Sequence, residues 1–88
     1  MKKVEVYFKA TCGYCRRAFE ILARHGVEPI KIDVDSDPKL WEESQKRSGR
    51  NTVPQIFIGD YHVGGCDDLM MLETRGQLDD YLSGKLPQ

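Results

Sequence analysis

Apolar and polar residues alternate in two early stretches of the chain, residues 3–8 and 30–34, and a period of two predicts a β-strand in each. A short apolar run over 54–58 predicts a third, central strand. The glycine–aspartate pair at 59–60 predicts a tight turn into a fourth strand over 61–63. The last two strands therefore form a hairpin.

Between the strands the apolar spacing changes to steps of three and four, which predicts helices. One spans residues 12–25, before a glycine of the kind that ends helices. An aspartate–proline pair starts a second helix over 38–48, which has few apolar residues and is expected to be exposed. A third helix, capped by Asp67 or Asp68, is interrupted at Gly76 and then resumes.

The order of these elements restricts the fold to a few topologies. Two strands joined by a helical crossover lie parallel, and the crossover is expected to be right-handed. The hairpin strands lie antiparallel. The sequence therefore predicts an α/β fold, in which a mixed four-stranded sheet is flanked by helices on both faces. Because the chain has no repeats, linkers or low-complexity tracts, residues 1–88 are expected to form a single domain.

Length and charge exclude several functional classes. The chain has 88 residues, enough for one small domain with a thin core. Its 13 basic and 14 acidic side chains give a net charge of -1, so neither nucleic acid nor a membrane is expected as a partner. No apolar run approaches the ~20 residues needed to cross a bilayer, and the N-terminus lacks a secretory stretch. With three cysteines rather than a disulfide framework, the expected compartment is the cytoplasm.

Cys12 and Cys15 lie where the first strand gives way to the first helix. Unpaired N–H groups and the positive end of the helix dipole favour a thiolate there, so Cys12 is predicted to be the nucleophile. Lys9, Arg16 and Arg17 would add positive charge nearby. Cys15 follows one turn later at the start of the apolar stripe. It is predicted to be the more buried, resolving cysteine, which forms a redox disulfide with Cys12.

A structural zinc site is the alternative use of these thiols. Cys12 and Cys15 would supply two ligands, and Cys66 and His62 would complete a tetrahedral set. His62 falls in a predicted strand, and the chain has no second pair of cysteines at this spacing. Redox chemistry is therefore favoured, and no metal ligand is assigned.

Three motifs resemble the glutaredoxin family, in particular its small bacterial dithiol members. They are the Cys-Gly-Tyr-Cys segment at 12–15, Thr-Val-Pro at 52–54 and Gly-Gly-Cys-Asp-Asp at 64–68. The likeness covers essentially the whole chain. It implies a thioredoxin fold and a glutathione-dependent thiol–disulfide oxidoreductase that reduces protein–glutathione mixed disulfides and protein disulfides. The partners it implies are glutathione, glutathionylated or disulfide-containing proteins and, indirectly, the glutathione reductase system. The chain is expected to be a monomer.

The resemblance assigns the glutathione site to eight residues: Lys9, Tyr14, Thr52, Val53, Pro54, Gly65, Cys66 and Asp67. Val53 would pair its backbone with the tripeptide as an added strand does, beside a cis proline. Cys66 and Asp67 would meet the γ-glutamyl end, because free N–H groups at a helix start bind carboxylates and an aspartate pairs with an ammonium. Lys9 would contact the glycine carboxylate, and Tyr14 would flank the ligand sulfur.

Several of these residues have a simpler interpretation from the sequence alone. Pro54 would start an edge strand, since proline cannot donate to a sheet ladder. Asp67 and Asp68 would cap a helix, or divide capping and ligand binding between them. Lys9 would be a solvated lysine, and Cys66 a small buried residue.

Gly13 departs from the pattern of these glutaredoxins, which usually have proline after the first cysteine. Proline suits the first helical position, whereas glycine leaves that turn freer, so the residue is expected to affect the redox potential. Relatives with a small residue here include ones that hold an iron–sulfur cluster between two subunits. The resemblance therefore leaves open a second function, a dimeric carrier of a glutathione-ligated [2Fe-2S] cluster bound through Cys12.

Overall fold

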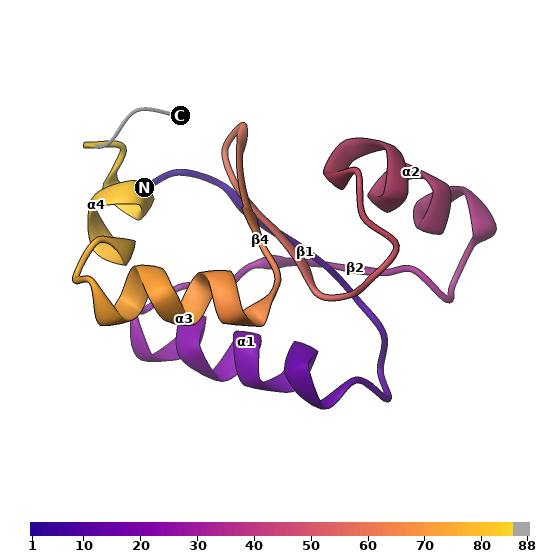
Figure 1. The fold of residues 1–88 in the computed structure, drawn as a ribbon, viewed down its shortest axis with the longest axis horizontal. Helices are drawn as coiled ribbons and strands as arrows, with labels where there is room; N and C mark the ends of the chain where they lie inside the picture. Colours follow the sequence, from indigo (N-terminus) through magenta and orange to yellow (C-terminus); the bar gives the residue numbers. More distant parts are fainter. Residues whose placement is uncertain (86–88) are drawn as a thin grey trace.

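A four-stranded sheet forms the centre of the computed structural model, which describes residues 1–85 (Figure 1). Its strands are β1 at Val4–Phe8, β2 at Ile30–Asp33, β3 at Gln55–Ile58 and β4 at Tyr61–Gly64. They lie in the order β2-β1-β3-β4. β1 pairs parallel with β2 and antiparallel with β3, and β3 pairs antiparallel with β4. The predicted mixed sheet is confirmed, including the hairpin turn between β3 and β4.

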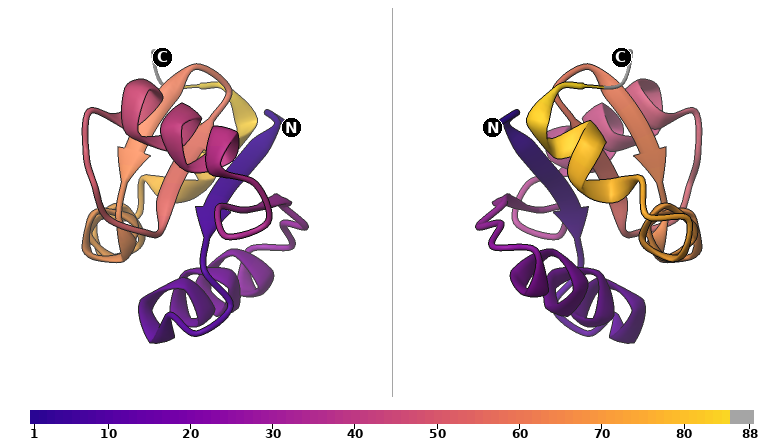
Figure 2. Two further views of the ribbon diagram at one scale, coloured as in Figure 1. Left: turned by 90° about the vertical axis from the view of Figure 1, so that its right-hand side faces the viewer. Right: turned by 90° about the vertical axis from the view of Figure 1, so that its left-hand side faces the viewer.

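Helices cover both faces of this sheet, as predicted. They are α1 at Gly13–Arg24, α2 at Pro38–Ser48, α3 at Cys66–Thr74 and α4 at Leu78–Ser83. α1 and α3 lie side by side on one face, and α2 lies alone on the other (Figures 1 and 2). Within residues 1–85, every helix is too short or too polar to span a bilayer.

Each face of the sheet packs its own apolar cluster. The larger cluster lies under α1, α3 and α4 and includes the fully buried Val6, Leu22 and Leu69. Burying one such side chain contributes about 1.5–3 kcal/mol, so this cluster fixes α1 and α3 on the sheet. On the other face Tyr7 and Phe57 make an edge-to-face contact with ring centroids 5.9 Å apart. The larger core therefore holds both α1, whose N-cap residue is Cys12, and α3, which begins at Cys66.

α2 is attached mainly through a charged network rather than a broad apolar face. The Tyr7 hydroxyl donates to Glu43 Oε2 at 2.6 Å, and Arg47 donates to the Tyr7 hydroxyl at 3.2 Å. Arg47 also donates to Glu5 Oε1 at 2.9 Å, and its guanidinium carbon lies 3.9 Å from the centroid of the Phe57 ring. The predicted exposure of this helix is confirmed.

The start of α3 differs from the sequence prediction. The N-cap residue is Gly65, and neither Asp67 nor Asp68 occupies that position. Asp68 is the third helical residue, and its carboxylate accepts the backbone N–H of Gly65 at 2.9 Å. An acidic residue at the third helical position satisfies a backbone donor at the helix start, as an N-cap side chain does. The prediction that an aspartate stabilises the helix start is therefore confirmed, but its position as the N-cap residue is wrong. Gly76 separates α3 from α4, as predicted.

Candidate active site

Cys12 is the N-cap residue of α1, after the short loop that follows β1. Its backbone is extended, and its Sγ accepts the backbone N–H of Cys15 at 3.2 Å. A sulfur in this position faces unpaired N–H groups and the positive end of the helix dipole, both of which stabilise negative charge. Sγ also lies 3.7 Å from the carbonyl oxygen of Val53, far along the chain. The predicted position of Cys12 at a helix start is confirmed.

Cys15 lies one turn further along α1 and is only 1% exposed, whereas Cys12 is partly exposed. Both are free thiols. Burial, followed by hydrogen bonding to Cys12, raises the pKa of the Cys15 thiol to about 12. Cys15 is therefore protonated near neutral pH. The pair consists of one accessible sulfur and one shielded sulfur, the arrangement that thiol–disulfide exchange requires.

The segment before β3 brings Thr52, Val53 and Pro54 beside Cys12. The Val53–Pro54 peptide bond is cis. The buried Gln55 side chain donates its amide N–H groups to the Thr52 carbonyl at 3.0 Å and to the Thr52 hydroxyl at 3.2 Å. His62 in turn lies 2.8 Å from Gln55 Oε1, so the segment is anchored to the hairpin.

The start of α3 approaches the same point from the other side. Cys66 is buried, and burial, with the nearby Asp67 charge, raises the pKa of its thiol. Burial would raise the pKa of Asp68, but hydrogen bonds from Gly65 and Arg50 outweigh it and lower that pKa. Asp67 is exposed and forms no ion pair within residues 1–85. Asp68 therefore supports the helix start, while the Asp67 carboxylate stays available.

These segments enclose a cleft of about 260 Å³ next to the cysteine pair. It is lined by seven of the eight residues assigned to glutathione, namely Tyr14, Thr52, Val53, Pro54, Gly65, Cys66 and Asp67. Tyr14 is 66% exposed on the first turn of α1. We refer to this space as the glutathione cleft, after the ligand that the sequence resemblance assigns to it. Segments from three parts of the chain meet there.

Two further residues differ from the sequence assignment. Lys9 does not line the glutathione cleft; its ammonium lies 4.8 Å from the centroid of the Trp41 ring. Arg50 does line the cleft and donates to Asp68 at 3.1 Å. The sequence analysis gave Arg50 no role, because its partner lies 18 residues later in the chain.

The zinc alternative required Cys12, Cys15, Cys66 and His62 to converge. No three histidine, cysteine, aspartate or glutamate residues among residues 1–85 are arranged to hold a metal ion. The His62 ring instead stacks on Phe57, with centroids 4.8 Å apart. Burial lowers the His62 pKa, as does the nearby charge of an arginine. The ligand set of this alternative is therefore not assembled.

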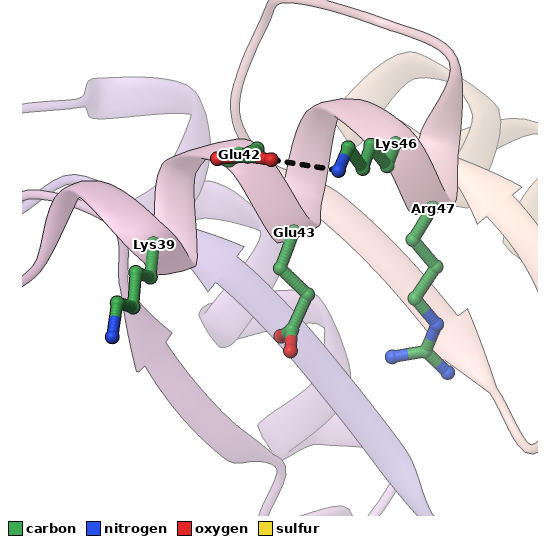
Figure 3. Close-up of a pocket in the computed structure, with 5 residues that line it drawn as sticks. All are labelled: Lys39, Glu42, Glu43, Lys46 and Arg47. Carbon is green, nitrogen blue, oxygen red and sulfur yellow. Dashed lines mark ion pairs between the residues drawn. The ribbon is translucent and has the colours of Figure 1, made fainter.

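A larger cleft, of about 650 Å³, lies along α2 and holds no thiol. Its lining side chains are all charged (Figure 3). Glu42 and Lys46 pair along the helix at 2.7 Å, while Glu43 and Arg47 point toward the strands (Figure 3). Glu43 accepts the hydroxyl of Tyr7 in β1, and Arg47 donates to Glu5 in the same strand. The charged cleft is therefore part of the attachment of α2, and it offers no nucleophile.

Comparison with known proteins agrees with this geometry. The family model for glutaredoxin matches residues 4–63. The chain is 51% identical to glutaredoxin 3 of Escherichia coli strain K12, over 93% of this chain and 99% of that protein. A solution structure of glutaredoxin from Brucella melitensis is 55% identical and has a TM-score of 0.86, with 99% and 96% of the two chains covered. A crystal structure of a buckwheat glutaredoxin–glutathione complex is 30% identical and has the same TM-score, covering 94% of this chain and 78% of that one. The chain therefore belongs to the glutaredoxin family and is a glutathione-dependent thiol–disulfide oxidoreductase with a thioredoxin-like fold.

Proposed function

We propose that this glutaredoxin reduces protein–glutathione mixed disulfides through Cys12 alone and protein disulfides through the Cys12–Cys15 pair. The observation that carries the proposal is the asymmetry of the two sulfurs beside the glutathione cleft. Cys12 is accessible and accepts a backbone N–H at the helix start, whereas Cys15 is shielded and protonated. One sulfur is thus suited to attack an external disulfide, and the other to attack Cys12 afterwards.

In the reaction with a mixed disulfide, the Cys12 thiolate attacks the glutathione sulfur. A new disulfide joins Cys12 to glutathione, and the substrate leaves as a thiolate that takes up a proton. A second glutathione, as its thiolate, then attacks the glutathione sulfur of the adduct. This step releases oxidised glutathione and restores Cys12. Cys15 takes no part in this cycle.

In the reaction with a protein disulfide, the Cys12 thiolate first bonds to one substrate sulfur and releases the other. Cys15 then attacks Cys12 Sγ, and the proton that it loses goes to the departing substrate thiolate. The resulting Cys12–Cys15 disulfide is reduced by two glutathione molecules, which leave as oxidised glutathione. Because Cys15 is buried and protonated, it does not compete with Cys12 for the external disulfide.

Glutathione is proposed to lie in the glutathione cleft with its cysteine sulfur toward Cys12. A buckwheat relative with the same fold forms a complex with glutathione. The backbone of Val53 would pair with the tripeptide, and the start of α3 would receive the γ-glutamyl carboxylate. Asp67 would bind the ammonium group. Lys9, whose ammonium lies 4.8 Å from the centroid of the Trp41 ring, would contact the glycine carboxylate.

The proposed setting is the cytoplasm, where glutathione keeps thiols reduced. The chain would work as a monomer on glutathionylated or disulfide-containing proteins. Oxidised glutathione would be reduced again by the glutathione reductase system.

A glutathione-coupled assay with two substrates tests the different roles proposed for Cys12 and Cys15. One substrate is a small glutathione mixed disulfide, and the other is a protein disulfide. Cys12→Ser is expected to abolish reduction of both. The matched variant Cys15→Ser is expected to keep most activity on the mixed disulfide and to lose activity on the protein disulfide. Equal losses from the two variants on the mixed disulfide would contradict the assignment of Cys12 as the single nucleophile.

In the iron–sulfur alternative, the Cys12 thiolate would be a cluster ligand instead of a nucleophile. This chain would contribute Cys12, and the remaining ligands would come from glutathione and a second chain. A Cβ at Gly13, the residue after Cys12, would meet nothing within 4 Å. Anaerobic purification with glutathione distinguishes the two functions. We expect a colourless monomer, whereas a brown dimer that bleaches when glutathione is removed would favour the carrier.

A further inference from the structure

A second cleft, of about 150 Å³, opens beside Cys12 and shares no lining residue with the glutathione cleft. Its walls come from the end of β1, the loop after it and the first two turns of α1: Phe8, Lys9, Ala10, Cys12, Cys15, Arg16 and Phe19. Cys12 lies between the two clefts, since its Sγ also contacts the Val53 carbonyl. We refer to this space as the second cleft.

The floor of the second cleft is apolar. Phe8 and Phe19 make an edge-to-face contact with centroids 5.3 Å apart, and both rings are partly exposed. The buried Cys15 also lines this cleft. An apolar cavity of about 150 Å³ is large enough for a group the size of benzene. The second cleft can therefore accept one apolar side chain.

The rim of the second cleft is positively charged. Lys9 and Arg16 are its charged lining residues, and neither forms an ion pair within residues 1–85. Lys31 adds a third cation, with its ammonium 4.8 Å from the centroid of the Phe19 ring. Asp33, opposite Phe8 in the sheet, is a neighbouring carboxylate, so cations outnumber acids here. The rim is complementary to a segment that carries negative charge.

Building on the proposed function, we propose that the second cleft recognises protein disulfide substrates with an apolar residue next to the reactive cysteine and carboxylates around it. When Cys12 is bonded to the substrate, the two sulfurs are about 2.05 Å apart. The residue next to the substrate cysteine then lies about 3.8 Å further along the chain, measured between Cα atoms, within reach of a cleft that Cys12 itself lines. The apolar side chain would contact Phe8 and Phe19, and flanking carboxylates would face Arg16 and Lys31.

Three disulfide-bridged peptides that differ only beside the attacked cysteine test this inference. One presents Glu-Leu before the cysteine, one Lys-Leu and one Glu-Ser. With the wild-type protein at low salt, kcat/KM for the Glu-Leu peptide is expected to exceed that for the Lys-Leu peptide about fivefold, the effect of one or two exposed ion pairs. The difference is expected to shrink in salt. The value of kcat/KM for the Glu-Leu peptide is expected to exceed that for the Glu-Ser peptide by about the same factor.

Ratios between peptides are the readout, because any change in Cys12 reactivity affects all three substrates equally and cancels. Arg16→Glu is expected to remove or reverse the preference for the acidic peptide. Phe19→Ala is expected to remove the preference for leucine. Arg75→Glu is the matched control, since this exposed arginine caps the far end of α3. It is expected to keep both ratios.

Equal kcat/KM values for the three peptides with the wild-type protein would overturn the inference, as would equal effects of Arg16→Glu and Arg75→Glu. Arg16 is exposed, so its variant tests the rim even if Phe19→Ala fails to fold. A small glutathione mixed disulfide separates the two proposals. If the wild-type protein reduces it but does not discriminate between peptides, only the second cleft loses its role. If it is not reduced, the proposed function fails.

Discussion

Asp67 and Asp68 are adjacent at the start of α3, and replacing each by alanine is expected to change a different property. The Asp68 carboxylate accepts the Gly65 N–H at 2.9 Å and the Arg50 guanidinium at 3.1 Å. Asp67 has no such partner within residues 1–85 and lines the glutathione cleft. Asp68→Ala should therefore reduce stability, and Asp67→Ala should reduce the affinity for glutathione.

The magnitude for Asp68→Ala follows from its two contacts. Loss of the bond to the helix-start N–H costs about 1 kcal/mol. Loss of the ion pair with Arg50 adds only about 0.5 kcal/mol, because both side chains are about half exposed. The expected total of about 1.5 kcal/mol lowers Tm by roughly 6–12 °C in a domain of this size. Asp67→Ala removes only a charge near a helix N-terminus, which is worth under about 0.5 kcal/mol when exposed.

Urea unfolding and steady-state kinetics separate the two effects. Asp68→Ala should lower the midpoint with an unchanged slope. Asp67→Ala should lower the midpoint less than Asp68→Ala does and raise KM for glutathione about tenfold, the effect of one lost charge-assisted contact. Equal losses of stability in the two variants would refute the division of roles, and so would an unchanged midpoint for Asp68→Ala.

The stabilising contribution of Asp68 should also depend on pH in a defined direction. Burial opposes ionisation, but the Gly65 N–H and Arg50 outweigh it and lower the Asp68 pKa in the folded protein. A lowered folded pKa gives stability that is present above the unfolded value of about 3.9 and is lost as pH falls through the folded value. The stability difference between wild type and Asp68→Asn should therefore be greatest near neutral pH and disappear in acid.

Three further predictions concern glycines and a histidine. Gly13→Pro should raise the free energy of unfolding by about 0.4–1 kcal/mol, measured by thermal unfolding. Proline suits the first helical position, and a Cβ there meets nothing within 4 Å. A lower free energy of unfolding would contradict this prediction. Gly64→Ala should lower the free energy of unfolding in urea by at least about 2 kcal/mol, because φ at this residue is +113° and a Cβ would overlap the Asp68 carboxylate. A variant as stable as wild type would contradict this prediction. Hydrogen bonding to Asp79, against a smaller effect of burial, raises the His25 pKa in the folded protein. The stability that His25 contributes is therefore present below its unfolded pKa of about 6.5 and is lost as pH rises through its folded pKa. The difference in free energy of unfolding between wild type and His25→Gln should therefore shrink between about pH 6 and pH 8.

The strands and helices could be predicted because their signals are local. Alternation in β1 puts Val6 on the face of the larger core and Tyr7 on the face of α2, as the sequence predicts. The start of α3 could not be located as well, because an acidic residue satisfies the same backbone donors from the cap or from the third helical position. Only the folded chain shows that Asp68 reaches back to Gly65.

The glutathione cleft was predictable from the resemblance more than from spacing. The motifs name seven of its lining residues, but spacing alone does not bring Thr52 and Asp67 to Tyr14. Arg50 lacked an assigned role because it lies outside the three motifs and its ion pair with Asp68 spans 18 residues. The position of Lys9 over Trp41 depends on where α2 packs, which its sparse apolar pattern does not determine.

The different behaviour of Cys12 and Cys15 arises at two levels of structure. The local level is the helix start, which gives the first sulfur backbone N–H groups and places the second one turn into the core. The tertiary level is the segment before β3, whose Val53 carbonyl lies 3.7 Å from Cys12 Sγ. A helix with the same cysteine motif but without that segment would retain the backbone N–H groups at its start and lose the side of the glutathione cleft that Thr52, Val53 and Pro54 form. The accessible first sulfur and the shielded second sulfur therefore follow from the first level, whereas the contact of Cys12 with the segment that lines the glutathione cleft follows from the second.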